Sequence, residues 1–191
     1  MPNAGPVAAG EAAVADVLAR LVRNVPDFPR EGVLFKDIAP LLGDPDGFRI
    51  VIDALAEGGR NSAGQVVVDK VAGIEARGFL LAAPVAVALG VGLVPVRKLG
   101  KLPGLTLQAS YELEYGEATL EVQSDAFGTG ERVLVVDDVL ATGGTVEAAL
   151  TLVERAGAVV TAVAVLIELT FLGARERLGS RDVRALLRVD A

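Results

Sequence analysis

The sequence predicts an α/β fold, with one doubly wound and mostly parallel β-sheet flanked by helices. Short aliphatic runs such as Val133–Val136 are typical of strands that are buried on both faces of a parallel sheet. These runs alternate with segments whose apolar residues recur at helical spacing. Glycine accounts for 22 of the 191 residues and aromatic residues for 4%, which favours many tight turns between aliphatic elements.

The N-terminal part is expected to form a small lobe, or hood. Residues 1–13 lack the basic start and the apolar stretch of a signal peptide, and they are predicted to be a flexible arm. Apolar residues at helical spacing from Val14 to Val22 predict an amphipathic helix, which ends before Pro26. A second helix is expected over about 45–57.

Beyond this lobe, predicted strands and helices alternate along the chain. No internal repeat or linker interrupts them, so residues 1–191 are expected to form one domain. The expected strands span 66–72, 92–97, 133–136 and 159–167, and the expected helices span 78–89 and 145–156.

Residues 98–125 break the alternation and are expected to form a β-hairpin flap. The segment begins with the basic, turn-rich stretch Lys98–Gly104, and apolar and polar residues then alternate around Gly116. Such alternation predicts a hairpin, here with a weakly specified turn. An ordinary surface hairpin is the alternative.

Composition excludes several classes of chemistry. The chain has no histidine and no cysteine, so a Ser-His-Asp triad, a cysteine nucleophile and a thiolate or imidazole metal site are impossible. Catalysis must use carboxylates, Lys, Arg, Tyr, hydroxyls, backbone amides or an oxygen-bound metal ion such as Mg²⁺. The formal charge of −7 argues against nucleic-acid binding. Residues 78–96 are uncharged, but Pro84 and Gly90 interrupt them, which predicts a buried helix and strand rather than a membrane span.

The most informative segment is the loop after the strand 133–136. A loop rich in Gly and Thr can aim backbone N–H groups at a phosphate, and the dipole of the following helix adds about 0.3–1 kcal/mol. Asp137 and Asp138 precede the loop; carboxylates repel phosphate, but they can hold a sugar diol or contact a Mg²⁺ complex through water. The predicted ligand is a phosphorylated sugar, and a plain Gly-rich connection with solvated acids is the alternative. The loop residues are Ala141, Thr142, Gly143, Gly144 and Thr145.

Val135–Thr145 resembles the phosphoribosyl-diphosphate (PRPP) loop of the type I phosphoribosyltransferases. Further segments, in order and spacing, are similar to the adenine phosphoribosyltransferase family and cover roughly residues 17–178. The resemblance implies that family's fold and the transfer of 5-phosphoribosyl from PRPP to N9 of adenine, which gives AMP and pyrophosphate in purine salvage. The matching segments are Pro26–Pro29, Gly32–Ile38, Ala72–Phe79, Arg97–Gly104, Ser110–Gly116 and Glu168–Thr170.

The resemblance also implies a role for each part of the site. The 5′-phosphate would bind the backbone of Ala141–Thr145, and the ribose hydroxyls would bind Asp137 and Asp138. Mg²⁺ would be the cofactor, held mainly through PRPP and water. A cis peptide bond between Glu75 and Ala76 is expected beside the pyrophosphate. The pyrophosphate-binding residues would be Arg77, Arg97, Lys98 and Lys101.

By the same resemblance, the flap carries the catalytic residues, with Glu114 as the acid/base partner of the purine and Tyr115 closing over the reacting centre. Adenine would bind near Leu34, with Phe35 stacking on its ring. Lys36 stands where family members often carry arginine. Many 6-oxopurine transferases have an aspartate at the position of Ala141, so this alanine favours adenine as the base.

Two other functions remain open at this point: the same reaction with another purine, such as xanthine, and ligand sensing by a PRPP-binding regulator. The pair Glu114-Tyr115, together with Lys98 and Lys101, favours an enzyme, because a sensor needs no complete catalytic flap. The expected partners are adenine, PRPP, AMP and pyrophosphate, without nucleic acid or membrane. A cytoplasmic homodimer is expected.

Overall fold

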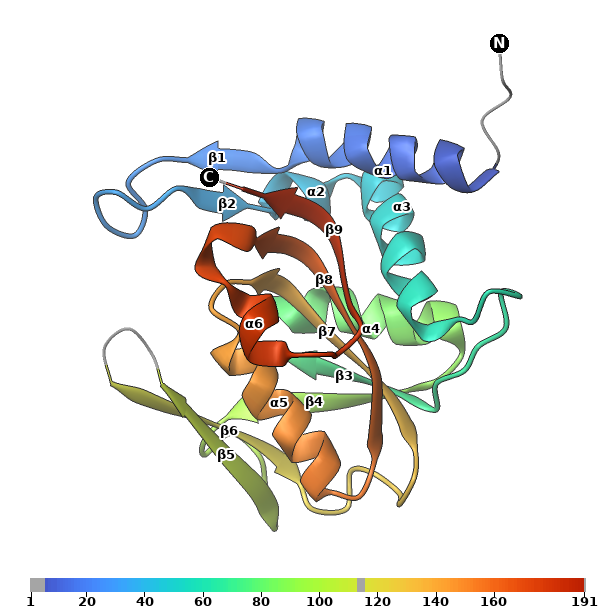
Figure 1. Ribbon diagram of the computed structural model, residues 1–191, viewed down its shortest axis with the longest axis vertical. Coiled ribbons are helices and arrows are strands. Elements are labelled where there is room, and N and C mark those ends of the chain that lie inside the picture. Colours follow the sequence, from blue (N-terminus) through green and yellow to red (C-terminus); the bar gives the residue numbers. More distant parts are fainter. Residues whose placement is uncertain (1–5, 113–115, 191) are drawn as a thin grey trace. The chain divides into compact units, whose positions relative to one another are not determined.

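The structure is a computed structural model, and it describes residues 6–112 and 116–190 (Figure 1). The chain divides into two compact units, Met1–Ala54 and Leu55–Ala191, and each is described by itself. The single domain over residues 1–191 stays a prediction.

The first unit contains helices and a short two-stranded ladder, in which β1 and β2 pair antiparallel. Helix α1 begins at Pro6, so residues 6–13 of the expected arm are helical, in keeping with the helix-forming residues Glu11, Ala12 and Ala13. Strands of three residues are too short to show a periodic pattern, and the sequence did not predict them. The elements are α1 (Pro6–Leu21), β1 (Arg23–Val25), β2 (Phe35–Asp37), α2 (Ala39–Gly43) and α3 (Pro45–Ala56), whose last turn enters the second unit.

The second unit contains a seven-stranded sheet in the order β5-β6-β4-β3-β7-β8-β9. The strands from β4 to β9 in this order are parallel, whereas β5 and β6 are antiparallel to each other and β6 is antiparallel to β4. This confirms the predicted mostly parallel sheet with a hairpin. The strands are β3 (Lys70–Ile74), β4 (Gly92–Lys98), β5 (Thr106–Glu112), β6 (Glu117–Gln123), β7 (Arg132–Leu140), β8 (Val159–Leu169) and β9 (Val183–Val189).

Helices cover both faces of this sheet, with α5 in front of it and α4 behind it in Figure 1. The crossovers β3-α4-β4 and β7-α5-β8 run outward in opposite directions from the central pair of strands, β3 and β7. None of the helices in the described ranges combines the length and the hydrophobicity that spanning a bilayer requires. The helices of this unit are η1 (Glu57–Gly59), α4 (Arg77–Leu89), α5 (Gly144–Arg155), η2 (Thr170–Leu172) and α6 (Ala174–Leu178).

Strand β7 illustrates why an uninterrupted aliphatic run is needed at the centre. Val133 and Val135 belong to one core cluster with apolar residues of α5, whereas the side chain of Leu134 lies against Gly58. All three are fully buried. Burial of each such side chain contributes about 1.5–3 kcal/mol, so both faces of the strand stabilise the sheet.

Some predicted boundaries differ from the structure. The strand expected over 66–72 is β3, which begins only at Lys70, because Val66 instead forms an isolated bridge with Arg60. Strand β7 continues beyond 136 to Leu140, so the two aspartates lie inside the strand rather than after it. The C-terminal elements α6 and β9 were not predicted.

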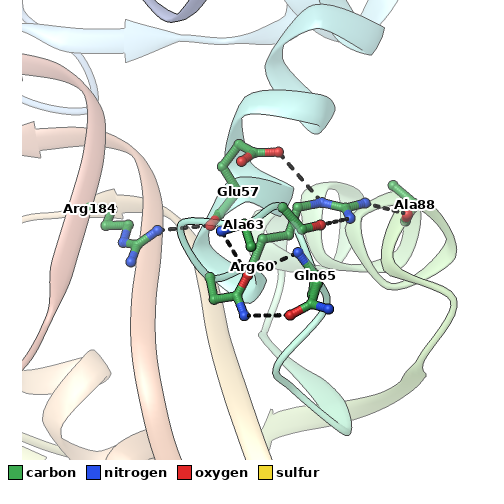
Figure 2. Close-up of polar contacts among 8 residues, drawn as sticks. Glu57, Arg60, Ala63, Gln65, Ala88 and Arg184 are labelled. Carbon is green, nitrogen blue, oxygen red and sulfur yellow. Dashed lines mark hydrogen bonds and ion pairs between the residues drawn. The ribbon is translucent and has the colours of Figure 1, made fainter.

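Figure 2 shows the polar contacts that fix the segment between α3 and β3. Arg60 lies 3.5 Å from the carboxylate of Glu57 and donates to the carbonyl oxygens of Gly64 (3.0 Å) and Ala88 (3.3 Å). Arg184 donates to the carbonyl of Glu57 at 2.8 Å. Ala88 lies in the last turn of α4, where a cation satisfies carbonyl groups that the helix leaves unpaired. This cluster therefore stabilises the edge of the sheet where the parallel strands begin, opposite their C-terminal ends.

The relative position of β3 and β7 is fixed by an ion pair at the same edge. Asp69 accepts three hydrogen bonds from Arg132: from the backbone N–H at 2.8 Å, from Nε at 3.0 Å and from Nη2 at 2.8 Å. The side-chain bonds from Arg132, then its backbone bond, lower the pKa of Asp69 from 3.8 to about 2. The unfolded chain therefore takes up a proton at Asp69 before the folded protein does as the pH falls.

We predict that Asp69→Asn lowers the free energy of unfolding at neutral pH and that this difference from the unsubstituted protein disappears between about pH 4 and pH 2. The reason is that Asp69 contributes stability only while its carboxylate is charged, above the pKa values of the two states. Urea denaturation at several pH values measures the difference. Asp53→Asn, which removes an exposed carboxylate on α3, is the charge-matched control. A pH-independent difference at Asp69 would contradict the assignment.

Candidate active site

The C-terminal ends of β3 and β7 form the point at which the sheet's connections change direction. In open α/β sheets, ligands bind at such a switch point, because the loops on either side diverge and leave a crevice. The register pairs Gly73 of β3 with Val136 of β7. Glu75–Arg77 and Asp137–Leu140 therefore follow side by side; α4 begins at Arg77, and α5 begins beyond Leu140 at Gly144.

The phosphate loop, Ala141–Thr145, joins β7 to α5. Gly143 has φ +86°, a conformation that favours glycine, and both Gly143 and Gly144 are buried. A Cβ at Gly144 would lie 3.2 Å from Arg177 Nη1 and 3.3 Å from Tyr111 Cδ2, so α6 and the hairpin both reach the loop. The first N–H groups of a helix have no partner within the helix. The start of α5 can therefore bind an anion, as the sequence predicts.

The two aspartates at the end of β7 are buried, with exposed fractions of 7% for Asp137 and 6% for Asp138. Asp137 Oδ1 accepts the backbone N–H of Asp138 at 2.9 Å. Arg77 Nε lies 2.7 Å from Asp138 Oδ2, yet this buried oxygen accepts no aligned hydrogen bond from the described residues. The charge of Arg77 offsets part of the cost of burying this carboxylate, and a ligand hydroxyl would add the aligned hydrogen bond.

The electrostatics of this pair suit a phosphorylated ligand. Burial raises the pKa of Asp137 well above its ordinary value, and the charge of Asp138 adds to the effect. Burial also raises the pKa of Asp138, although the charge of Arg77 opposes the rise. Two negative charges are thus disfavoured at this point, which lessens the repulsion between the pair and an anionic ligand.

The turn between β3 and α4 contains the predicted cis peptide bond, between Glu75 and Ala76. Glu75 Oε2 accepts hydrogen bonds from the backbone N–H of Lys98 at 3.0 Å and from Arg97 Nε at 3.1 Å. Burial would raise the pKa of Glu75, but these bonds and the two positive charges hold it below its ordinary value. Arg77, Arg97 and Lys98 therefore lie around one turn at the end of β3 and β4.

Glu121 holds the basic stretch that follows β4, a role that the sequence did not predict. It lies on β6 with an exposed fraction of 2%, and its Oε1 accepts the N–H groups of Lys101 and Leu102, each at 2.8 Å. The expected alternation around Leu120 and Val122 places Glu121 toward solvent, whereas all three are buried. A buried carboxylate needs hydrogen-bond donors, so Glu121 between two buried aliphatic residues is the feature of the sequence that could have indicated a bound loop backbone.

The predicted flap is a β-hairpin whose register runs from Thr106 opposite Gln123 to Glu112 opposite Glu117. Its strand β5 packs against α5, and the two elements line a cleft of about 480 Å³. Glu114 and Tyr115, the expected catalytic residues, lie outside the described residues, so their roles stay predictions. The cleft is lined in part by Ser110, Tyr111, Glu112, Glu147, Thr151 and Arg177, and it lies beside the phosphate loop rather than at the aspartates.

The residues expected to bind adenine belong to the first unit. Phe35 lies on β2 and makes an edge contact with the ring of Phe28, with centroids 5.0 Å apart and planes at 71°. Leu34 is half exposed, and Lys36 Nζ donates to Asn24 Oδ1 at 2.7 Å. This unit thus presents an aromatic pair beside an exposed aliphatic side chain, and its part in base binding stays a prediction.

The chemistry of the acidic residues fits a metal ion that arrives with its ligand. Among the described residues, no group of three or more acidic side chains could hold a metal ion by itself. Mg²⁺ commonly keeps several waters and binds through one or two carboxylates plus substrate phosphates. The pair Asp137 and Asp138 supplies the one or two carboxylates that such a Mg²⁺ complex needs.

Comparison with known proteins agrees with this geometry. The family model of the phosphoribosyl transferase domain matches residues 42–181. An adenine phosphoribosyltransferase from a Nocardioides species is 58% identical over 97% of this chain and 98% of its own.

Solved structures extend the similarity to the fold. The crystal structure of adenine phosphoribosyltransferase from Rhodothermus marinus has a TM-score of 0.85 and 50% identity, covering 93% of this chain and 99% of that one. The Saccharomyces cerevisiae enzyme, complexed with D-2,5-dideoxy-2,5-imino-altritol 1,6-bisphosphate and adenine, has a TM-score of 0.87 and 42% identity, with 92% and 99% covered. The chain therefore belongs to the adenine phosphoribosyltransferase family of type I phosphoribosyltransferases, which convert adenine and PRPP into AMP and pyrophosphate.

Proposed function

We propose that the residues assembled at the switch point divide the work of this transfer among them. One observation carries the proposal: strand β7 bears a buried carboxylate pair, one oxygen of which pairs with Arg77 but accepts no aligned hydrogen bond from the described residues, and the strand leads directly into a loop and helix start suited to phosphate. A ribose 5-phosphate presents both complementary groups, a pair of hydroxyls and a dianion, on one molecule.

The 5′-phosphate binds the backbone of Ala141–Thr145 at the start of α5, and the ribose hydroxyls donate to Asp137 and Asp138. The member of the pair that carries the charge accepts such a bond strongly, because charge-assisted hydrogen bonds are about twice as strong as neutral ones. These two anchors fix the ribose at both ends. The C1′ atom is then held in one orientation while its bond to pyrophosphate breaks and its bond to N9 of adenine forms.

The leaving pyrophosphate is bound on the other side of the crevice, by Arg77, Arg97, Lys98 and Lys101. Arg97 is half buried and bound to Glu75, whereas Lys98 and Lys101 are exposed and can follow the leaving group. Mg²⁺, when bound with PRPP, neutralises charge on the diphosphate. Asp137 and Asp138 are the residues of this chain that would hold the hydrated ion, through its waters.

Adenine binds at Leu34, Phe35 and Lys36, with the ring of Phe35 stacked on the base. Glu114 is the acid/base partner of the purine, and it accepts the proton that N9 loses as the bond to C1′ forms. Tyr115 closes over the reacting centre and excludes water, which would otherwise capture the ribose. The hairpin of β5 and β6 is the flap that carries both residues.

We also propose that the chain works as a cytoplasmic homodimer. Large apolar side chains are exposed on α4 and at the start of β4: Val87 is 82% exposed, Leu80 49% and Leu93 41%. Exposed apolar surface costs about 25 cal/mol per Å², and association of two copies would cover it. The absence of cysteine is compatible with a reducing compartment.

The function is tested by incubating the purified protein with Mg²⁺, PRPP and one purine base at a time, and separating the products by chromatography. Adenine should give AMP and pyrophosphate, while xanthine, hypoxanthine and guanine should give little or no nucleotide. Removal of Mg²⁺ with a chelator should stop the reaction. If adenine gives no AMP, the proposed function is wrong.

Glu114→Gln should reduce kcat by about 10²–10⁴-fold, the usual contribution of a general acid or base, because the amide cannot accept the N9 proton. The Kd for PRPP should change little. Glu117→Gln, an exposed substitution on the neighbouring strand β6, is the matched control and should leave kcat unchanged. Equal losses in kcat and in PRPP binding would indicate that Glu114 only positions the flap.

A further inference from the structure

A buried carboxylate at the end of β8 has no part in the reaction described above. Glu168 has an exposed fraction of 2%. Strand pairing places it beside Leu140, the last residue of β7, on one side and beside Arg188 of β9 on the other. Glu168 is thus the strand neighbour of Leu140, the residue directly before the phosphate loop.

Two arginines bind Glu168 in different ways. Arg175 of α6 forms a bidentate pair with Glu168, in which Nε donates to Oε1 at 2.6 Å and Nη2 donates to Oε2 at 2.9 Å. Arg188 approaches Oε2 only at 3.4 Å, from β9. The bidentate bond to Glu168 raises the pKa of Arg175. Because planar forks of this kind fix geometry as well as charge, Arg175 locks α6 onto the end of β8.

Helix α6 in turn forms the wall behind the phosphate loop. A Cβ on Gly143 would lie 3.3 Å from Ala174 Cβ, 3.4 Å from its Cα and 3.4 Å from its carbonyl oxygen. Ala174 is 2% exposed and is the residue directly before Arg175. A second contact joins the helices, since Arg177 lies 3.3 Å from the carboxylate of Glu147 in α5. The position of Gly143 therefore depends on where α6 is held.

We propose that Arg175, clamped by Glu168, is a positioning residue for the 5′-phosphate. It touches no substrate; it holds Ala174 against Gly143 so that the loop keeps its phosphate-binding conformation before the ligand arrives. This inference rests on the proposed function, in which that loop binds the 5′-phosphate. Without the clamp the loop samples other conformations, and each binding event must order it again.

The clamp therefore affects ligands that carry a 5′-phosphate and spares those that do not. AMP and adenosine have the same base and ribose and differ only in this group. The ratio of their dissociation constants, Kd of adenosine over Kd of AMP, measures what the phosphate contributes to binding. A residue that acts only on overall stability would change both constants together and leave the ratio unchanged.

Isothermal titration calorimetry of AMP and adenosine tests this on Arg175→Met, which keeps the length and loses the fork, and on Arg175→Lys. We expect Arg175→Met to lower the ratio by about 10-fold, a loss comparable with those seen when outer partners of metal ligands are removed. Arg175→Lys, which keeps one donor, should lose less. In steady-state assays KM for PRPP should rise more than kcat falls.

Arg188→Met is the matched control, because Arg188 contacts the same carboxylate but belongs to β9 and not to α6. The ratio of dissociation constants for this variant should stay within about 2-fold of that of the unsubstituted protein, a change as small as those that most surface substitutions cause. If Arg175→Met fails to fold, Arg175→Lys carries the same comparison. An unchanged ratio at Arg175, or an equal loss at Arg188, would overturn the proposal. Failure of the proposed function is separate: the unsubstituted protein would then make no AMP from adenine.

Discussion

The parallel pairing of β3 with β7 is the constraint on which the rest of the site depends. The crossovers leave this pair in opposite directions, and the turn at Glu75–Arg77 lies beside Asp137 and Asp138 at the C-terminal ends, where open α/β sheets bind ligands. The ion pair of Asp69 with Arg132 fixes the register at the other end of the strands. A slip of one residue would move the aspartates by about 3.3 Å against the turn and separate Asp138 from Arg77.

Acidic side chains that are buried or half-buried divide into two kinds near the C-terminal ends of the parallel strands. Glu75, Glu121 and Glu168 have strong donors within the protein, and each holds a segment in place: the end of β4, the basic stretch after it, and α6 behind the phosphate loop. Asp138 differs, since its buried Oδ2 accepts no aligned hydrogen bond from the described residues. The acids with aligned donors thus hold segments of the backbone, whereas Asp138 keeps an acceptor without an aligned donor, which we propose serves the ligand.

The sequence predicted the central sheet because its signals are local, and the proposal of a phosphate loop rests on a local signal too. Val133–Val136 and the Gly- and Thr-rich loop each carry their pattern within a few residues. It could not predict the holding roles of Glu121 and Glu168, because their partners lie 20 and 7 residues away and meet them only through strand pairing and the docking of α6. The start of β3 was predicted too early for a different reason: Val66 favours a strand, but it forms an isolated antiparallel bridge with Arg60, six residues before it, and does not join the sheet.

We propose that one end of β7 binds both the phosphate and the sugar of the nucleotide, and a crystal structure of the protein with AMP would test this. We expect the 5′-phosphate on the backbone N–H groups of Ala141–Thr145 and both ribose hydroxyls on Asp137 and Asp138, with Asp138 Oδ2 now accepting a hydrogen bond. A phosphate bound elsewhere, or ribose hydroxyls that leave both aspartates untouched, would contradict it.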